Sequence, residues 1–198
     1  MATLFNSTGK IVLASGSPRR RSYFSDLGLS FQVVPADIEE QRKADEPAKA
    51  YVRRLAREKA AAIAENYPSS WIVAADTVVC LDDCVLGKPD SSEAAVKTLS
   101  LLSGREHMVH TAVCLQNVEE DVQDILLVTT GVLFWNVPIA AIKRYVSTGE
   151  SMDKAGSYGI QGMGAFLVRE IRGSYSNVVG LPLCEVVELL MQHKLIRK

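Results

Sequence analysis

The chain has 198 residues, of which 47% are hydrophobic and 23% are charged, and its formal net charge is -1. This composition fits one or one and a half globular domains with a sizeable core, and the near-neutral charge disfavours a nucleic-acid-binding surface, which needs a basic excess. The N-terminus lacks the regions of a signal peptide, and no apolar run approaches the ~18 residues of a membrane span, so we expect a cytoplasmic protein without nucleic-acid or membrane partners.

Strand and helix patterns alternate along the chain. In order, the sequence predicts a strand at 10–14, a helix at 18–27, a strand at 31–34, a helix at 47–66, a hairpin of strands at 71–81 and 84–86, a helix at 91–103, strands at 108–115 and 125–134, a helix at 138–147, a strand at 164–171 and a helix at 182–193. Two long neighbouring strands among alternating elements favour an α/β fold with a mixed sheet.

The turn after the first strand, residues 14–21, combines Gly16, a predicted N-cap at Ser17, a first-position proline and three arginines. Cations at a helix N-terminus oppose the helix dipole, which favours anions there. Free backbone N–H groups together with Arg20 and its neighbours would suit a phosphate. An ordinary strand-to-helix turn with solvated arginines is the alternative.

Lys59 falls on the apolar stripe of the helix predicted at 47–66, together with Val52, Leu55 and Ile63. An inward lysine can extend its ammonium to the surface. It can also point into a polar site and bind a phosphate.

Asp76 lies in the middle of the most apolar strand-like run, residues 71–80. A bare carboxylate there would cost several kcal/mol of desolvation, so it needs a cation, a metal or a hydrogen-bond donor. A structural ion pair and a catalytic or metal-binding acid both satisfy that need.

Two glycine-containing segments, 153–162 and 173–182, suit neither a helix nor a strand and read as ligand-binding loops. The first contains Gln161, whose amide offers a donor and an acceptor to a base edge. Lys88 follows a predicted strand between Gly87 and Pro89, and taken alone it is a weak signal.

The cysteines and histidines do not suggest a metal site. Cys80 and Cys84 span the predicted hairpin, and His107 and His110 lie three apart on a strand, hence on opposite faces. Without disulfide-framework spacing, the four cysteines are expected to be reduced and mostly buried.

Taken together, residues 14–20, 75–77, 87–89, 153–162 and 173–182 closely resemble the motifs of the Maf family, in the same order. The resemblance implies a single domain over residues 1–198 with a Maf/inosine-triphosphatase-like α/β fold. This fold has an elongated mixed sheet, flanking helices and a cleft between two lobes, with no linker between the lobes. It also implies a homodimeric nucleoside triphosphate pyrophosphatase that depends on a divalent cation, Mg²⁺ or Mn²⁺, and has a housecleaning role in the nucleotide pool. The stretch 158–162 resembles the branch that hydrolyses dTTP and UTP, with related or modified pyrimidine nucleotides as further substrates.

The resemblance also implies roles for individual residues. Asp76 is the implied catalytic acid/base and, with Glu40, a metal ligand, although Glu39 is adjacent and the sequence does not choose between the two glutamates. The implied substrate-binding residues are Ser15, Ser17, Arg19, Arg20, Lys59, Thr77, Lys88 and Gln161. Residues 1–9 precede the motifs and are expected to do nothing catalytic.

Three rival functions use part of the same pattern. A nucleotide sensor would need the phosphate site but not a buried Asp76. A protein that acts in division control by protein contacts would show a nucleotide-independent surface motif, which we do not find. A kinase or γ-phosphatase would release a diphosphate or orthophosphate in place of pyrophosphate.

Overall fold

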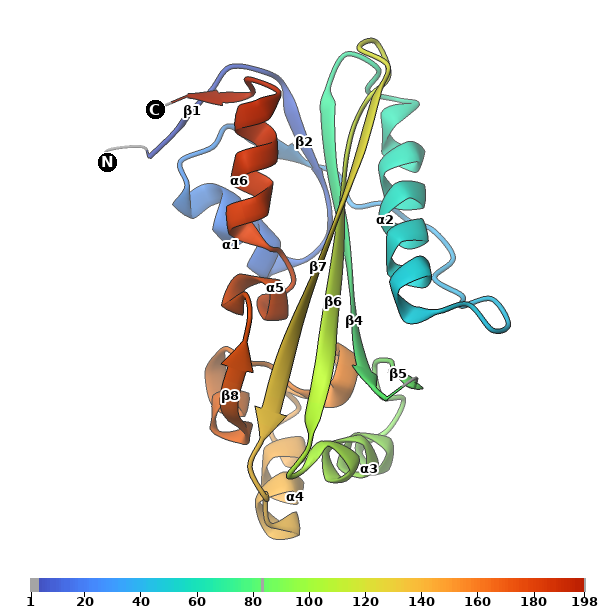
Figure 1. Ribbon diagram of the computed structural model, residues 1–198, viewed down its shortest axis with the longest axis vertical. Coiled ribbons are helices and arrows are strands. Elements are labelled where there is room, and N and C mark those ends of the chain that lie inside the picture. Colours follow the sequence, from blue (N-terminus) through green and yellow to red (C-terminus); the bar gives the residue numbers. More distant parts are fainter. Residues whose placement is uncertain (1–3, 83, 198) are drawn as a thin grey trace. The chain divides into compact units, whose positions relative to one another are not determined.

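The computed structural model describes residues 4–82 and 84–197, and Figure 1 shows its elements. The strands are β1 (Asn6–Ser7), β2 (Ile11–Ala14), β3 (Phe31–Val33), β4 (Trp71–Leu81), β5 (Cys84–Leu86), β6 (Glu106–Asn117), β7 (Val122–Phe134), β8 (Val168–Arg172) and β9 (Ile196–Arg197). The helices are α1 (Pro18–Asp26), α2 (Ala48–Ala64), α3 (Ser92–Leu102), α4 (Ile139–Ser147), α5 (Tyr175–Val179) and α6 (Leu183–Gln192), with 3-10 turns η1 (Ala155–Ser157) and η2 (Gly162–Leu167).

Most predicted elements are confirmed, and the β4–β5 hairpin has the predicted bounds. Its turn residue Asp82 has a φ of 53°, and Asp83 lies outside the described residues. The strand predicted at 164–171 is wrong in its first half, because residues 162–167 form η2. Gly164 packs so closely that an added Cβ would lie 2.3 Å from the Gly159 carbonyl oxygen, a tight turn that an extended strand would not make.

Among the described residues, α5, η1 and the strands β1 and β9 were also not predicted. The segment 173–182, expected to be a loop, contains the short helix α5. Near the N-terminus, β1 pairs antiparallel with β9, so Asn6 lies opposite Arg197. Residues 6 and 7 therefore have a structural role in unit 1.

The main sheet is mixed, as expected, with strand order β3-β2-β4-β6-β7-β8 and with β5 paired to β4. β2 runs parallel to β3 and β4, whereas β5 is antiparallel to β4 and β8 is antiparallel to β7. The β2–β4 register pairs Ala14 with Ala74. The turn that follows Ala14 therefore begins beside the β4 segment that leads to Asp76.

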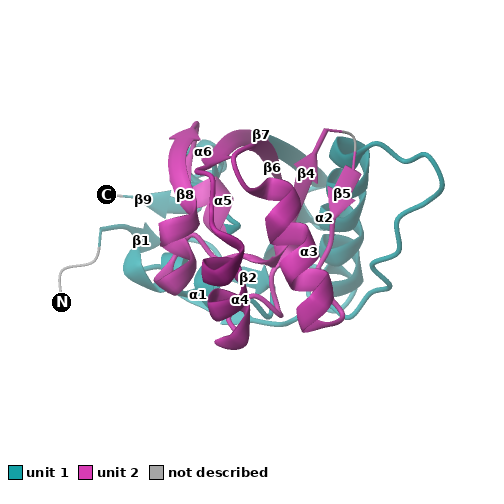
Figure 2. Cartoon of the chain, turned by 90° about the horizontal axis from the view of Figure 1, so that it is seen from below, with its two compact units in different colours: residues 1–76, 111–127, 180–198 teal, residues 77–110, 128–179 magenta. Residues whose placement is uncertain are grey.

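The chain divides into two compact units, coloured separately in Figure 2. Unit 1 comprises residues 1–76, 111–127 and 180–198, and unit 2 comprises residues 77–110 and 128–179. In unit 1, α2 lies on one side of the strands and α1 and α6 lie on the other (Figure 1). The fully buried side chains of Leu13, Phe24 and Leu181 belong to one apolar cluster on the α1–α6 side. Burial of such apolar surface is the main source of stability for unit 1.

Unit 2 packs α3 against α4 and η1. Its interior contains an aromatic cluster in which the rings of His107, Phe134 and Tyr158 meet edge to face, with centroids 4.9–5.4 Å apart. This geometry is the favourable arrangement for aromatic pairs.

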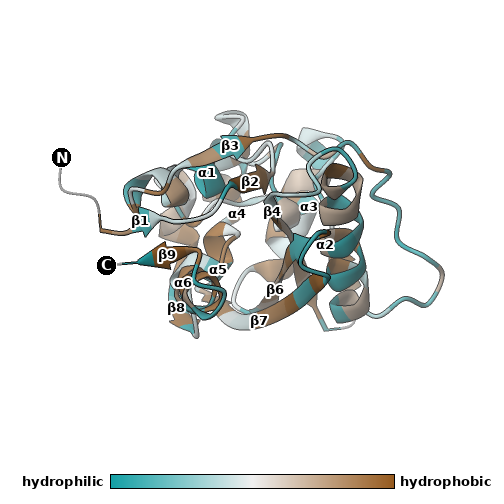
Figure 3. Ribbon diagram, turned by 90° about the horizontal axis from the view of Figure 1, so that it is seen from above, coloured by the Kyte–Doolittle hydropathy of each residue, from teal (hydrophilic) through white to brown (hydrophobic). Residues whose placement is uncertain are grey.

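Figure 3 shows that α2 carries both hydrophobic and hydrophilic residues, as the predicted amphipathic pattern requires. Within residues 4–82 and 84–197, no helix combines the length and apolar character needed to cross a membrane. All four cysteines are free thiols. Cys80 and Cys114 are buried but Cys84 and Cys184 are exposed, so the expectation of mostly buried thiols holds for only half of them.

Candidate functional site

The centre of the candidate site is an ion cluster in unit 1. The Nζ atom of Lys59 lies 2.6 Å from Oδ1 of Asp76 and 2.6 Å from Oε1 of Glu40. Lys59 comes from the inward face of α2 and Asp76 from β4, so the helix and the strand that follows it in the chain bring the charges together. The inward orientation predicted for Lys59 is confirmed, and its ammonium does not extend to the surface.

Burial gives this cluster its chemical character. Asp76 and Lys59 are each only 8% exposed, whereas the Glu40 side chain is 47% exposed. Burial raises the pKa of Asp76 above its ordinary value, although the nearby charges of Lys59 and Arg20 oppose the rise. A carboxylate with a raised pKa is a stronger base than an ordinary aspartate, which suits proton transfer near neutral pH.

The turn between β2 and α1 borders the same cluster. Arg20 donates from Nε to the Gly180 carbonyl oxygen at 2.7 Å and from Nη1 to the Ala75 carbonyl oxygen at 2.8 Å. Burial lowers the pKa of Arg20, while the negative charges of Asp76 and Glu40 favour its protonated form. Arg20 therefore ties the turn to the middle of β4, at the residue directly before Asp76, as well as supplying positive charge.

Ser15 shapes the turn from within. Its hydroxyl oxygen accepts the Ser17 amide at 3.2 Å and Nη1 of Arg20 at 3.4 Å. Ser17 occupies the predicted N-cap position, but its side chain makes no capping hydrogen bond to α1. Arg19 is half-buried beside Arg20 and Arg21 is exposed.

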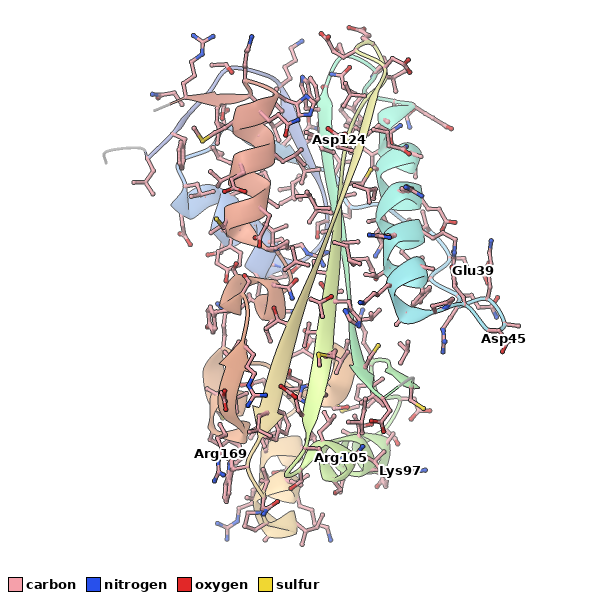
Figure 4. The ribbon with its side chains drawn as sticks, viewed as in Figure 1. Glu39, Asp45, Lys97, Arg105, Asp124 and Arg169 are labelled. Atoms are coloured by element: carbon pink, nitrogen blue, oxygen red, sulfur yellow. The ribbon has the colours of Figure 1, made fainter. Side chains whose placement is uncertain are left out.

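The loop before α2 carries Glu40 into contact with Lys59. Figure 4 labels its neighbour Glu39 on the same loop, and the ion pair with Lys59 belongs to Glu40. The Tyr51 hydroxyl donates to the Glu40 carbonyl oxygen at 2.8 Å, and Arg54 donates to the Gln41 carbonyl oxygen at 2.9 Å. Two residues of α2 therefore fix the backbone on either side of the Glu40–Gln41 peptide.

Arg54 is itself fixed by acidic partners. Its Nε and Nη2 atoms bind the two carboxylate oxygens of Glu46 at 2.7 and 2.8 Å, and Nη1 binds Glu58 at 3.0 Å. The Arg54 hydrogen bonds lower the pKa of Glu46 to about 2. This bidentate geometry is the most specific form of an Arg–carboxylate pair.

The carboxylates of Glu40 and Asp76 fit a divalent cation that is bound together with substrate. Both contact one point, the ammonium of Lys59, and carboxylate oxygens are the ligands that Mg²⁺ prefers. Among the described residues, no group of three or more His, Cys, Asp or Glu is arranged to hold a metal. Two carboxylates match Mg²⁺, which is commonly held by one or two carboxylates plus substrate phosphates.

The remaining predicted residues belong to unit 2. Thr77 follows Asp76 in β4 and is half-buried, whereas Lys88 and Gln161 are exposed. The Gly156 amide donates to the Gly87 carbonyl oxygen at 3.2 Å, which joins the Lys88 segment to the start of the Gln161 segment. The structure thus groups the predicted residues into two sets, one in each unit.

Tyr158, in the stretch that resembles the dTTP- and UTP-hydrolysing branch, is an interior residue of unit 2. It is 5% exposed, and its hydroxyl lies 2.8 Å from Nε2 of His107. Burial raises its pKa. Its direct role is to anchor the residues that precede Gln161.

Sequence reasoning missed Tyr51 as a residue that holds the site. It lies on the same stripe of α2 as Leu55 and Lys59, where a tyrosine reads as part of the core. The available signal was a tyrosine at a position expected to be buried, because a buried hydroxyl normally finds a hydrogen-bond partner.

Comparison with known proteins identifies the relatives of this chain. Residues 10–193 match the family described as Maf-like protein. Proteins of Desulfotalea psychrophila and Vibrio parahaemolyticus, both named dTTP/UTP pyrophosphatase, are 48% and 49% identical to it. The first alignment covers 94% of this chain and 95% of the relative, and the second covers 92% and 96%. A protein of Myxococcus xanthus with the same name is 49% identical, over 91% of this chain and 90% of its own.

Among solved structures, the Ham1 protein of Staphylococcus aureus superposes with a TM-score of 0.55 at 14% sequence identity. The alignment covers 93% of this chain and 99% of that protein. At this identity the likeness concerns the fold alone, and it confirms the predicted fold class.

Proposed function

The chain belongs to the Maf-like protein family, and from that premise we propose that it hydrolyses dTTP and UTP to the nucleoside monophosphate and pyrophosphate. The observation that carries the proposal is the buried Asp76–Lys59 pair with Glu40 beside it. It provides a base, a phosphate-binding cation and a second carboxylate at one place. The relatives named dTTP/UTP pyrophosphatase support the choice of substrate.

In the proposed reaction the carboxylate of Asp76 accepts a proton from a water molecule. The water oxygen attacks the α-phosphorus in line, a new P–O bond forms, and the bond from the α-phosphorus to the bridging oxygen breaks to release pyrophosphate. The raised pKa of Asp76 favours this proton transfer. Lys59 and Arg20 supply positive charge for the triphosphate, as do Arg19 and Lys88 in this proposal.

Glu40 and Asp76 are proposed to hold Mg²⁺ or Mn²⁺. When bound, the cation would neutralise phosphate charge and polarise the α-phosphoryl group. Ser15 and Ser17, from the turn before α1, and Thr77, after Asp76, are proposed substrate contacts. Gln161 is proposed to read the pyrimidine edge, because its amide can offer one donor and one acceptor.

The proposed substrate residues are divided between the two units. The reaction is therefore proposed to need the whole domain, residues 1–198. Action as a homodimer in the cytoplasm, on related or modified pyrimidine nucleotides as well, is part of the same proposal and is supported by the family resemblance.

A panel of nucleoside triphosphates tests the proposal, with pyrophosphate and orthophosphate measured separately and with Mg²⁺ or Mn²⁺ added or chelated. We expect pyrophosphate from dTTP and UTP only when the metal is present. The matched control is the Asp76→Asn protein under the same conditions. Release of orthophosphate together with the nucleoside diphosphate would contradict the proposed bond cleavage.

A further inference from the structure

Tyr145, in the last turn of α4, and Glu150, just beyond that helix, hold the segment that contains Gln161. The Gly159 amide donates to the Tyr145 hydroxyl at 3.1 Å, and the same hydroxyl donates to Oε1 of Glu150 at 3.0 Å. Burial raises the pKa of Tyr145, so the hydroxyl keeps its proton and serves as a donor. Tyr145 thereby connects the backbone before Gln161 to Glu150.

Glu150 holds the backbone after Gln161. Its Oε2 atom accepts the Met163 amide at 3.0 Å, and Oε1 accepts the Gly164 amide at 3.0 Å. The backbone amides of Gly159, before Gln161, and of Met163 and Gly164, after it, therefore all donate to the hydrogen-bonded pair of Tyr145 and Glu150. We refer to residues 159–164 as the Gln161 loop.

Close packing leaves this loop little room to shift. An added Cβ on Gly164 would lie 2.7 Å from the Tyr145 hydroxyl, and one on Gly162 would lie 3.0 Å from Oε2 of Glu150. Gly162 also has a φ of +78°, which L side chains rarely adopt. Ile160 is only 8% exposed. The backbone is thus fixed while the Gln161 side chain remains exposed.

Glu150 is suited to remain charged in this setting. Burial works against its ionisation, but the amide hydrogen bonds from Gly164 and Met163, together with Tyr145, outweigh burial and lower the pKa of Glu150. An ionised carboxylate has acceptor capacity on both oxygens, whereas a neutral amide offers one acceptor atom. The three donors that converge on Glu150 therefore require the carboxylate form.

We propose that Tyr145 and Glu150 are positioning residues for base selection, which fix the angle at which Gln161 meets the nucleotide base. This inference rests on the proposed role of Gln161. A hydrogen bond to a base edge depends steeply on distance and direction. A displacement of about 1 Å can cost on the order of 10²-fold in rate when it misplaces a substrate. The Tyr–Glu pair would thus affect discrimination between bases without touching the substrate.

A double-mutant cycle separates positioning from a merely structural role. The kcat/KM values for UTP and GTP are measured for Glu150→Gln, Gln161→Ala and the double variant, with unfolding midpoints as a check on folding. Glu150→Gln preserves the size of the side chain but replaces one of its two acceptor oxygens with an NH2 donor group. We expect its UTP-to-GTP ratio to fall roughly tenfold, mainly through KM for UTP. In the Gln161→Ala background, the same change should alter the ratio by no more than about twofold, the usual scatter of additive effects.

Two further variants complete the test. Tyr145→Phe removes only the hydroxyl and should lower the UTP-to-GTP ratio in the same direction, which keeps the test available if Glu150→Gln does not fold. Glu170→Gln is the matched control, because Glu170 is an exposed carboxylate of unit 2 that binds Arg172 instead of this loop. It should leave the ratio unchanged.

An equal loss for UTP and GTP, or the same loss of ratio in both backgrounds, would overturn the inference and leave the proposed function intact. A wild-type protein that releases no pyrophosphate from either nucleotide would overturn the proposed function, and this inference with it. A ratio that falls only when Gln161 is present supports the inference.

Discussion

Lys59 and Asp76 form a buried ion pair, with 2.6 Å between Nζ and Oδ1 and 8% exposure for each residue. The two partners are not equivalent, because Lys59 also contacts Glu40. Removal of the Asp76 charge leaves the ammonium with a second carboxylate, whereas removal of the Lys59 charge leaves Asp76 without its nearest cation. This asymmetry separates the effects of the two mutations.

Asp76→Asn should abolish most turnover while the protein stays folded, because the amide has nearly the same shape but cannot accept the proton. A positioned general base contributes typically ~10²–10⁴-fold. Pyrophosphate release from UTP measures the rate, and the urea unfolding midpoint measures the fold. If the variant keeps more than about a tenth of the wild-type rate, Asp76 is a structural residue only.

Lys59→Met should destabilise the protein more than Asp76→Asn does. Loss of one partner of a buried ion pair leaves an uncompensated charge and is typically worth about 3–5 kcal/mol. Urea unfolding at neutral pH measures the free energy, and Lys59→Arg, which keeps the charge, is the control. Equal unfolding midpoints for Lys59→Met and the wild type would show that the pair adds nothing to stability.

Tyr51→Phe should weaken metal activation, because it removes the hydrogen bond that fixes the Glu40 backbone. Loss of a residue that orients a metal ligand typically lowers affinity about 10–100-fold. The Mg²⁺ concentration for half-maximal pyrophosphate release gives the measurement. Tyr175→Phe, at an exposed tyrosine of unit 2, is the control and should leave that concentration unchanged. An unaltered Mg²⁺ dependence in Tyr51→Phe would rule out this role.

Gln161→Ala should reduce selectivity more than rate. Loss of a hydrogen-bond partner from a polar edge is worth on the order of 1–3 kcal/mol, or roughly 5- to 150-fold. We expect kcat/KM for UTP and dTTP to fall by such a factor and kcat/KM for purine triphosphates to change much less. If all triphosphates lose the same factor, Gln161 contacts phosphate or supports its loop.

His107 should make stability depend on pH. Burial lowers its pKa to about 4 in the folded protein, whereas an unfolded histidine titrates near ~6.5. The unfolded state therefore binds the extra proton first. The contribution of neutral His107 to the free energy of unfolding is fully present above the pKa of the unfolded state. It is lost as the pH falls from there through the pKa of the folded state.

For this residue alone, the loss between pH 7 and pH 5 should be about 2 kcal/mol. Urea unfolding at the two pH values measures the loss. His107→Phe should make the free energy of unfolding less dependent on pH, although it is less stable at pH 7 because Tyr158 loses its partner. An unchanged pH dependence in that variant would assign the effect to other groups.

The periodic parts of the fold were predictable because their signals are local. The hairpin of β4 and β5 was predictable from two runs of strand-forming residues on either side of an Asp turn. The inward face of α2 was predictable from the helical spacing of its apolar residues, a series that includes Lys59. The turn at Gly162–Leu167 was missed because its conformation depends on the hydrogen bonds to Glu150, which lies 12 residues or more away. Local propensity contains no information on that contact.

The candidate site likewise has a part that the sequence predicted and a part that it did not. The motifs pointed to Asp76, Lys59 and Glu40, and the structure brings these three together. The motifs did not predict that the Arg20 guanidinium binds the carbonyl oxygens of Ala75 and Gly180. Every residue has a backbone carbonyl oxygen, so the sequence does not show which ones accept a hydrogen bond from a side chain.

Unit 1 is built from segments at both ends of the chain, which has a consequence for its synthesis on the ribosome. Its core cluster joins Leu13 and Phe24, made early, to Leu181, Val186 and Leu190, made last. Chains emerge at about 5–20 residues per second, so the segment with Leu13 and Phe24 is made roughly 8–30 seconds before the helix that covers it. The apolar surface of this segment therefore stays uncovered through most of synthesis, and a chain truncated before α6 would lack the residues that complete the cluster.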